Sequence, residues 1–434
     1  MRTRLRAPIA AALAILAGTA AWAESPGPSI TADAAVREAL SANVDLQAAR
    51  LAIESARGGL LQAGRLDNPE LGASLTDDFA FQSEGERRVS LGFAQRFPIT
   101  ARLAREKDVA RGDVAIAEAE VRGFARTLIA DVQRAFFAVR AFDERIGVDA
   151  DLIEAVQRVE DATAKRLEVA EASPAELSLL RIERLRLEQD SIRLTREREV
   201  ALALLARLLG RPSPEGLGPT GDLDPAGVPR SAVPGEPTAD YAKRPELEAA
   251  RAEIERAESS RALARAQVWE DWTVGLGYER ERDILRAPIG TTTDSFVSLD
   301  VAVPLPIWNR QQGRIAAADT EKRRAELARA GLELRIQEEI RAAQARVRAS
   351  RASVEAYARE ILPESDRARA TYERGYQQGL IGIADLLQAQ RQYNEGRALY
   401  VELTGELRQA AIDLEAATAT SPHLHELRYD GEAP

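Results

Sequence analysis

The sequence predicts a mainly α-helical protein with a membrane β-barrel, in which a long antiparallel α-helical barrel continues into four β-strands per protomer. Three observations lead to this fold class: an internal repeat, helical segments of matching length, and short segments in which apolar residues alternate with small or polar ones. The repeat comes first, because a fixed internal period decides the architecture of the whole chain.

The two halves of the chain have related sequences. Residues 43–56 (NVDLQAARLAIESA) match residues 244–257 (RPELEAARAEIERA) at an offset of 201. Residues 90–99 match residues 298–307 at an offset of 208, so the second half carries seven extra residues. We expect these extra residues to form a loop at 281–294, since insertions in repeats fall in loops. Each half predicts the same order: helix, strand pair, very long helix, tight turn, helix.

The helices of each half must match in length. A helix over residues 100–169 would extend about 105 Å. Helices over 31–66 and 174–209, placed end to end, would extend about 108 Å. The sequence therefore predicts one long helix beside two short ones stacked end to end, twice over. In the second half the short helices are expected over 239–268 and 383–420 and the long one over 309–378.

These segments define the expected organisation of the chain. Seven prolines between 212 and 237 mark the connection between the halves. In order, we expect a signal peptide at 1–23, a first repeat at 24–210 (hairpin about 70–98, long helix 100–169, turn 170–173, helix 174–209), a proline-rich linker at 211–238, a second repeat at 239–420 (hairpin about 272–305, long helix 309–378, turn 379–382, helix 383–420) and a C-terminal tail at 421–434.

The first residues have the pattern of an export signal. Arg2, Arg4 and Arg6 precede an apolar run from 7 to 21 that is too short to span a bilayer as a helix. Ala21-Trp22-Ala23 is a cleavage site of the A-x-A kind. We therefore expect export with cleavage after Ala23; the alternative is an uncleaved anchor.

The composition limits the class of protein. Charged residues make up 29% of the 434 residues and aromatic residues 5%, a mixture typical of long helices and coiled coils. The net charge of −10 argues against nucleic acid as a partner. With no Cys, one Met and two His, we expect no metal site, no cofactor and no catalytic residues. His423 and His425 form an H-x-H pair, which is either a metal-binding fragment or a polar tail.

The four strand segments alternate with period two. In one of them Val89, Leu91 and Phe93 share a face, and Ser90 and Gly92 share the other. Each segment has roughly nine to eleven residues, which a tilted strand needs to cross a bilayer. The pattern fits either a soluble half-buried sheet or a membrane barrel with a wet lumen. Because a bilayer tolerates no open sheet edge, four membrane strands would have to join those of other protomers.

Three tryptophans stand at the strand ends nearest the helices. Trp269, Trp272 and Trp308 occupy the positions where a membrane barrel carries an interfacial aromatic girdle. Ordinary core packing is the alternative for these side chains.

The chain resembles the TolC outer-membrane factor family over essentially all of its mature sequence. The resemblance rests on the repeated halves, the linker between them and the stretch YQQGLIGIADLLQAQ at 376–390. It implies a homotrimer with a twelve-stranded barrel in the outer-membrane lipid of the cell and a helical tunnel extending into the periplasm. It also implies a periplasmic adaptor (membrane-fusion protein) and an inner-membrane RND-type pump as partners.

One stretch is similar to a subgroup of that family. The segment PLPIWNRQQGRIAAA at 304–318 resembles CzcC-like and CusC-like members, which serve heavy-metal cation efflux. The matching stretch in the first half, 97–110, departs from the LGGKR-like run of those members, and no Cys is present for a lipid anchor. The resemblance implies a passive exit duct for metal cations, not an enzyme. A drug-efflux or type I protein-secretion duct and a periplasmic coiled-coil structural protein are the alternatives.

The same resemblance points to candidate site residues. The family places its periplasmic aperture and its adaptor-docking surface at the two helix–helix turns, which here run from Ala170 to Ser173 and from Gly379 to Gly382. Gly379 and Gly382 would give the second turn its backbone freedom. Asp385 matches a position that can form an acidic aperture ring, and it is also an ordinary acid for a helix N-terminus. Glu176, its repeat mate, and Glu171 would add to an acidic mouth.

Overall fold

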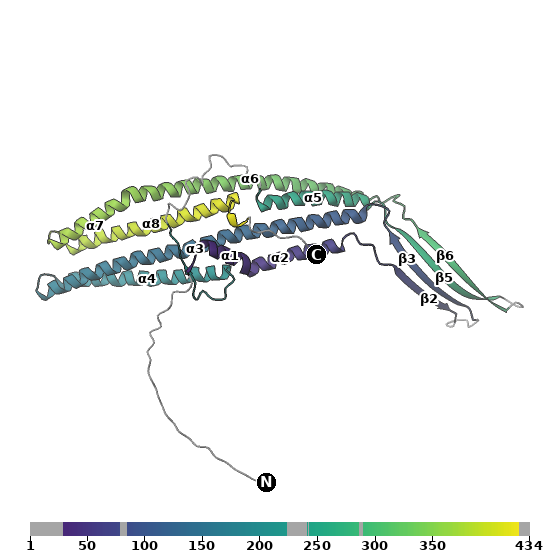
Figure 1. Ribbon diagram of the computed structural model, residues 1–434, viewed down its shortest axis with the longest axis horizontal. Coiled ribbons are helices and arrows are strands. Elements are labelled where there is room, and N and C mark those ends of the chain that lie inside the picture. The colour runs from purple at the N-terminus through teal and green to yellow at the C-terminus, as the bar shows by residue number, and fades with distance from the viewer. Residues whose placement is uncertain (1–28, 79–84, 224–240, 242, 286–289, 425–434) are drawn as a thin grey trace, which may run out of the picture.

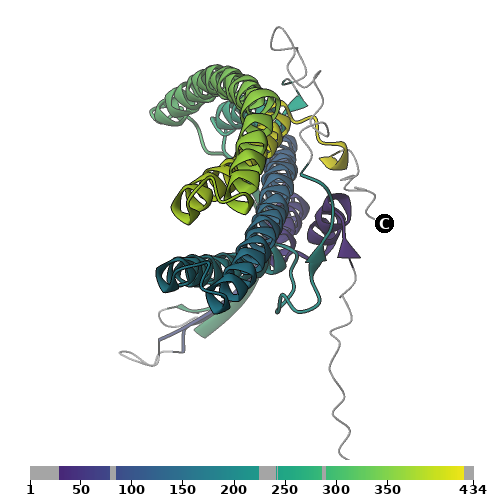
Figure 2. The same cartoon turned by 90° about the vertical axis from the view of Figure 1, so that its left-hand side faces the viewer.

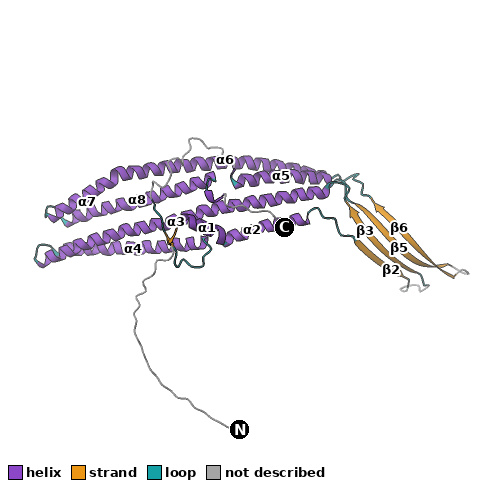
Figure 3. Cartoon of the chain, in the orientation of Figure 1, coloured by secondary structure: helices purple, strands orange, loops and turns teal. Residues whose placement is uncertain are grey.

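The computed structural model describes residues 29–78, 85–223, 241, 243–285 and 290–424. The expected signal peptide, most of the proline-rich linker and His425 lie outside the described residues. The described chain is a long bundle of helices with a four-stranded sheet at one end (Figures 1 and 3). None of the described helices contains a segment long and apolar enough to cross a lipid bilayer.

The first half is built around one long helix. The helices α1 (Ala32–Ala42) and α2 (Val44–Gln62) lead to the strands β2 (Glu70–Asp77) and β3 (Arg87–Phe97). Helix α3 (Arg102–Glu168) has 67 residues, about 100 Å at the rise of an α-helix. Helix α4 (Pro174–Leu208) returns beside it with Pro174 in its first turn.

The second half follows the same order. Helix α5 (Pro245–Ala266) leads to β5 (Trp272–Leu285) and β6 (Gly290–Ala302). The return path consists of α6 (Gln312–Ala356), a π-helical segment (Tyr357–Ile361) and α7 (Leu362–Gln377), and α8 (Ile383–Thr418) runs back along it. A short pair, β1 (Ser29–Ile30) with β4 (Gly218–Pro219), and a 3₁₀ turn (Pro422–Leu424) complete the described part.

The helices form one curved layer (Figure 2). Helix α3 contacts both α2 and α4 on one side and both α5 and α8 on the other, and α6 and α7 lie beyond α8 and α5. The short helices therefore stand end to end beside the long ones. Helix α1 and the 3₁₀ turn lie on the convex side of the layer (Figure 2).

The first end-to-end junction depends on Asn43. The sequence predicts one helix over 31–66, but the chain is extended at Asn43 (φ −61°, ψ 122°) and the helix is split there. The buried Asn43 side chain accepts a hydrogen bond from the Leu46 N–H (2.8 Å) and donates one to the Leu208 carbonyl (2.9 Å). The Asn43 amide thus caps the start of α2 and also donates a hydrogen bond to a carbonyl in the last turn of α4 that has no partner within its own helix.

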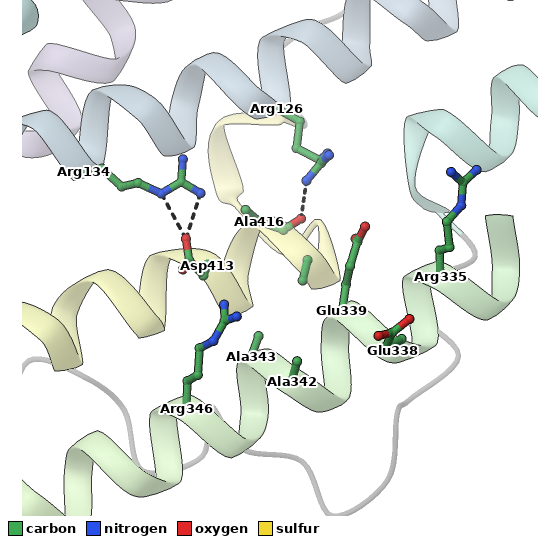
Figure 4. Close-up of a pocket in the computed structure, with 11 residues that line it drawn as sticks. Arg126, Arg134, Arg335, Glu338, Glu339, Ala342, Ala343, Arg346, Asp413 and Ala416 are labelled. Carbon is green, nitrogen blue, oxygen red and sulfur yellow. Dashed lines mark hydrogen bonds and ion pairs between the residues drawn. The ribbon is translucent and has the colours of Figure 1, made fainter.

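Charged side chains connect the two helix ends at the second junction, where α8 ends and α5 begins (Figure 4). Arg126 of α3 donates to the Ala416 carbonyl (2.7 Å), and the buried Arg244 donates to the Ala417 carbonyl (3.3 Å). Both arginines also pair with Glu246 in the first turn of α5. Burial raises the pKa of Glu246, but Arg126 and Arg244 outweigh it, so the pKa lies below its ordinary value. A hollow of about 560 Å³ between α3, α6 and α8 adjoins this junction.

The long helix expected over 309–378 is interrupted. The first α-helical residue is Gln312, and the π-helical segment Tyr357–Ile361 separates α6 from α7. Pro363 explains the break: a proline has no N–H and its ring clashes with the preceding turn, and the wider π turn absorbs this mismatch.

The sheet is antiparallel throughout, in the order β2-β3-β5-β6. The insertion expected to form a loop at 281–294 instead lengthens the strands, since β5 has 14 residues and β6 has 13, against 8 and 11 in β2 and β3. Within the described part, β2 and β6 each pair along one side only.

The register brings most of the apolar residues of the four strands onto one face. One row consists of Leu71, Phe93, Leu276 and Leu299, and the next row on the same face consists of Ala73, Leu91, Tyr278 and Val297. The row between them, on the opposite face, is Gly72, Gly92, Gly277 and Ser298. Leu71 is 79% and Val297 80% exposed in the single chain, so helices do not cover this apolar face.

Candidate functional site

Both helix–helix turns lie at the end of the molecule opposite the sheet (Figure 1). The first joins α3 to α4 and the second joins α7 to α8. The turns have the same backbone pattern, as the sequence repeat predicts. In the first, the Glu171 N–H donates to the Arg166 carbonyl (2.8 Å), and in the second the Leu380 N–H donates to the Gly375 carbonyl (2.9 Å).

The left-handed residue of this pattern differs between the two turns. Gly379 has φ +72° and Ala170 has φ +59°. A left-handed conformation costs a residue with a Cβ about 1–2 kcal/mol, so the first turn carries strain that the second avoids. Gly382 does not need this freedom: it lies at φ −77° and ψ 159°, an extended conformation open to any residue. Gly382 therefore does not supply the backbone freedom that we expected of it, whereas Gly379 has the left-handed conformation.

The helices that leave the turns begin differently. Ser173 accepts a hydrogen bond through its hydroxyl from the Glu176 N–H (3.2 Å) and so caps α4. Gly382 precedes α8 and provides no side-chain cap. The Asp385 carboxylate instead lies toward this uncapped start of α8, close to Gly382. A negative charge at a helix N-terminus is stabilised by the helix dipole.

The three candidate acids have different surroundings. Asp385 is exposed in the first turn of α8, Glu176 is half-buried in the first turn of α4, and Glu171 is exposed in the turn itself. Asp385 forms no ion pair with any described residue. Within the described part of the chain, no cationic side chain therefore neutralises this carboxylate.

Tyr376 joins the two hairpins near the turns, and the sequence did not single it out. Its hydroxyl lies 3.1 Å from the hydroxyl of the buried Thr163 of α3, and the Arg166 guanidinium lies 5.6 Å from the centre of its ring. Both partners belong to the other half of the chain, about 210 residues away. Helical periodicity describes one helix at a time, so it carries no signal for such a pair.

A second cross-connection lies further along the helices. Arg391 of α8 donates to both carboxylate oxygens of the buried Glu183 of α4, at 2.8 and 2.6 Å. The hydrogen bond to Glu183 raises the pKa of Arg391 above its ordinary value. Two parallel hydrogen bonds between one guanidinium and one carboxylate have a fixed geometry, so this ion pair sets the position of α8 relative to α4.

The three tryptophans lie where the sheet meets the helices. Trp272 begins β5 and is directly opposite Phe97, on the apolar face of the sheet. Trp269 follows α5, and Trp308 lies between β6 and α6. Trp308 is 87% exposed and Trp269 44% exposed, so neither ring is packed into a core of the single chain.

The described residues contain no group of three His, Cys, Asp or Glu side chains arranged to hold a metal ion. His423 is buried, and its Nε2 lies 3.3 Å from Asp33 Oδ1 in the first turn of α1. Its observed contact thus ties the C-terminal 3₁₀ turn to the N-terminal helix.

Comparison with known families gives one match over most of the chain. Residues 35–211 and 241–420 match the profile of the family described as outer membrane efflux protein. The two matched segments correspond to the two sequence repeats.

One characterised protein is related in sequence. The chain is 25% identical over 397 residues to the cobalt-zinc-cadmium resistance protein CzcC of Cupriavidus metallidurans, and the alignment covers 90% of each chain.

Solved structures share the fold. A structure of CusC superposes with a TM-score of 0.74 at 17% identity, covering 91% of this chain and 93% of the other. The open state of the Neisseria gonorrhoeae MtrE outer membrane channel superposes with a TM-score of 0.70 at 19% identity, covering 89% and 88%. At these identities the similarity shows the fold and does not distinguish between cargoes.

Proposed function

Because the chain belongs to the outer membrane efflux protein family, we propose that three copies of it form the outer-membrane duct of a tripartite efflux system. The observation that carries this proposal is the sheet: four strands with two open edges and an exposed apolar face. A sheet in lipid must close into a barrel, and about eight strands is the practical minimum. Three chains of four strands would close one barrel of twelve.

The proposal assigns a place to each end of the molecule. The strands cross the outer membrane with Trp269, Trp272 and Trp308 at its periplasmic surface, and about 100 Å of helix extends into the periplasm. The turns at Ala170–Ser173 and Gly379–Gly382 then form the inner end of the duct. A periplasmic adaptor docks at these turns, and an inner-membrane RND-type pump supplies the energy. Export depends on cleavage of the signal peptide after Ala23.

Heavy-metal cations are the proposed cargo. The relative named for cobalt, zinc and cadmium resistance supports this, because the two chains align along almost their whole lengths. Asp385 adds a physical argument: three copies at a shared axis would form a negatively charged ring that attracts cations. Glu176 and Glu171 would extend this acidic mouth.

Conductance in a planar lipid bilayer tests both the duct and the ring. We expect the wild-type protein to conduct with a preference for cations and the Asp385→Asn variant to lose part of that preference. Glu395→Gln, which removes a charge from an exposed position further along α8, is the control and should keep wild-type selectivity.

Three results would argue against parts of the proposal. Unchanged selectivity in Asp385→Asn would remove the aperture role from that residue. A wild-type protein that stays soluble without detergent and shows no conductance would favour the coiled-coil structural alternative. A drug-type pump encoded beside this gene would replace metal cations by another cargo on the same duct.

A further inference from the structure

Toward its far end the apolar face of the sheet carries charged residues. On this face Leu75 and Val89 are followed two residues along their strands by Asp77 and Arg87, and Tyr278 is followed by Arg280 and Arg282. We refer to Arg87, Arg280 and Arg282 as the arginine band. The other end of the apolar face, nearest the helices, carries the tryptophans, so the two boundaries differ in chemistry.

Contacts between side chains show that the band shares the apolar face. The Tyr278 hydroxyl lies 3.3 Å from the hydroxyl of Ser295, and Ser295 is the direct cross-strand partner of Arg280. Arg87 pairs with Asp77 at 2.9 Å. Arg88, by contrast, pairs with Glu279 at 3.0 Å and with Glu281, which places those charges on the opposite face.

Among the described residues at this end of the apolar face, the three arginines of the band are accompanied by one acid, Asp77. Arg87 and Arg282 are direct cross-strand partners, an arrangement in which like charges repel. Asp77 is the acid that pairs with Arg87, while Arg280 and Arg282 form no ion pair with any described residue. Both are exposed. An anion bound beside these side chains would offset the repulsion between them.

We propose that the arginine band binds the phosphate groups of lipids in the outer leaflet of the outer membrane. This rests on the proposed function, which places the far end of the strands at the outer surface. Guanidinium groups suit phosphate because their N–H donors bind two oxygens at once. The hydroxyls of Thr293 and Ser295, the cross-strand partners of Arg282 and Arg280, stand beside them as further donors.

The position of the band favours a lipid over a free anion. It directly borders the apolar face, so a phosphate on an acyl-chain lipid would keep its chains against Tyr278 and Leu276 while its head group meets the arginines. From Trp272 to Arg282 the strand has eleven residues, the length that a tilted strand needs to cross a bilayer, so the band lies at the level of the membrane surface opposite the tryptophans. The arginines lie on β3 and β5, the two central strands, so each protomer would carry a complete site.

Native mass spectrometry of the detergent-solubilised full-length protein tests the proposal, with diphosphoryl lipid A as the probe. We expect the double variant Arg280→Gln/Arg282→Gln to bind it at least about tenfold more weakly than wild type, since it loses two charge-assisted contacts. Arg88→Gln is the matched control, because it removes one charge at the same level of the sheet but on the opposite face. It should bind the probe as wild type does.

Further measurements keep this test separate from that of the duct. Co-sedimentation with phospholipid vesicles shows whether wild type and variants insert at all; failure of the wild type would contradict the duct itself. If all proteins insert but the double variant binds lipid A as strongly as wild type, the arginine band is not a lipid site. Equal binding of dephosphorylated lipid A, or competition by millimolar inorganic phosphate alone, would also overturn it.

Discussion

Asp149 is a carboxylate in a position where charge is costly. Its side chain is 5% exposed on α3, and its Oδ2 has no hydrogen-bond partner within the described chain. Burial raises the pKa of Asp149, and nearby Asp190 adds to this, against a weaker opposing effect of Arg145 at 3.4 Å. Because the folded-state pKa is raised, the group favours the folded state at low pH, and this contribution is lost as pH rises through that raised pKa.

We therefore expect Asp149→Asn to be more stable than wild type at pH 7.5, by about 1 kcal/mol or more, since a neutral amide is cheaper to bury than a charge that Arg145 offsets only in part. The difference should shrink as the pH is lowered toward the raised pKa of Asp149. Thermal unfolding followed by circular dichroism at pH 7.5 and pH 5 measures both effects. Asp161→Asn, an exposed position on the same helix, is the control. A larger stability difference between Asp149→Asn and wild type at pH 5 than at pH 7.5 would contradict the raised pKa of Asp149.

At the level of single residues the sequence predicted positions better than partners. It located Asp385 at a helix start and Gly379 at a left-handed turn, because both depend on local rules. It did not find Tyr376 with Thr163, nor Arg391 with Glu183, because those contacts depend on how helices from different halves are rotated against each other. A single-sequence pattern carries no information on that rotation.

For the secondary-structure elements, the sequence predicted the arrangement of the helices better than the positions where they break. The end-to-end stacking of short helices followed from matching lengths, which the repeat makes visible. The breaks at Asn43 and at Tyr357–Ile361 did not, although both have local causes in the sequence. Pro363 predicts an interruption on its own, whereas the role of Asn43 also depends on the Leu208 carbonyl that it meets across the junction. The longer second hairpin was missed because an insertion that keeps the strand alternation extends a strand as readily as a loop.

The Asn43 junction gives a prediction at this scale. We expect Asn43→Ala to destabilise the protein by about 1–3 kcal/mol, because it removes the cap of α2 and leaves the buried Leu208 carbonyl without its donor. Thermal unfolding measures the loss, and limited proteolysis between 40 and 46 reports whether the junction opens. Ser41→Ala removes an exposed side-chain hydrogen bond two residues away and should have little effect. If Ser41→Ala and Asn43→Ala are equally stable, the double capping role is wrong.

For the whole molecule, what surrounds the sheet decides between a membrane duct and a soluble coiled-coil protein. The single chain exposes one face made of Leu71, Phe93, Leu276 and Leu299 and their neighbours, and another made of glycines and small polar residues. In water the exposed apolar face could accept a charge at little cost. In lipid the same charge would be expensive, whereas the small-residue face would lie toward a wet lumen and tolerate it.

We therefore predict that Leu299→Arg and Ser298→Arg, on neighbouring residues of β6 with opposite orientations, have different effects. Arginine at 299 should destabilise the inserted protein by about 2–4 kcal/mol and reduce the yield of the proposed trimer, measured by gel electrophoresis of unheated outer-membrane extracts. Arginine at 298 should leave that trimer intact, because Gly277 and Gly92 in the same row leave room for the side chain. Both variants carry the same added charge on the same strand, so composition cannot account for a difference between them. Equal trimer yields would show that the apolar face does not meet lipid.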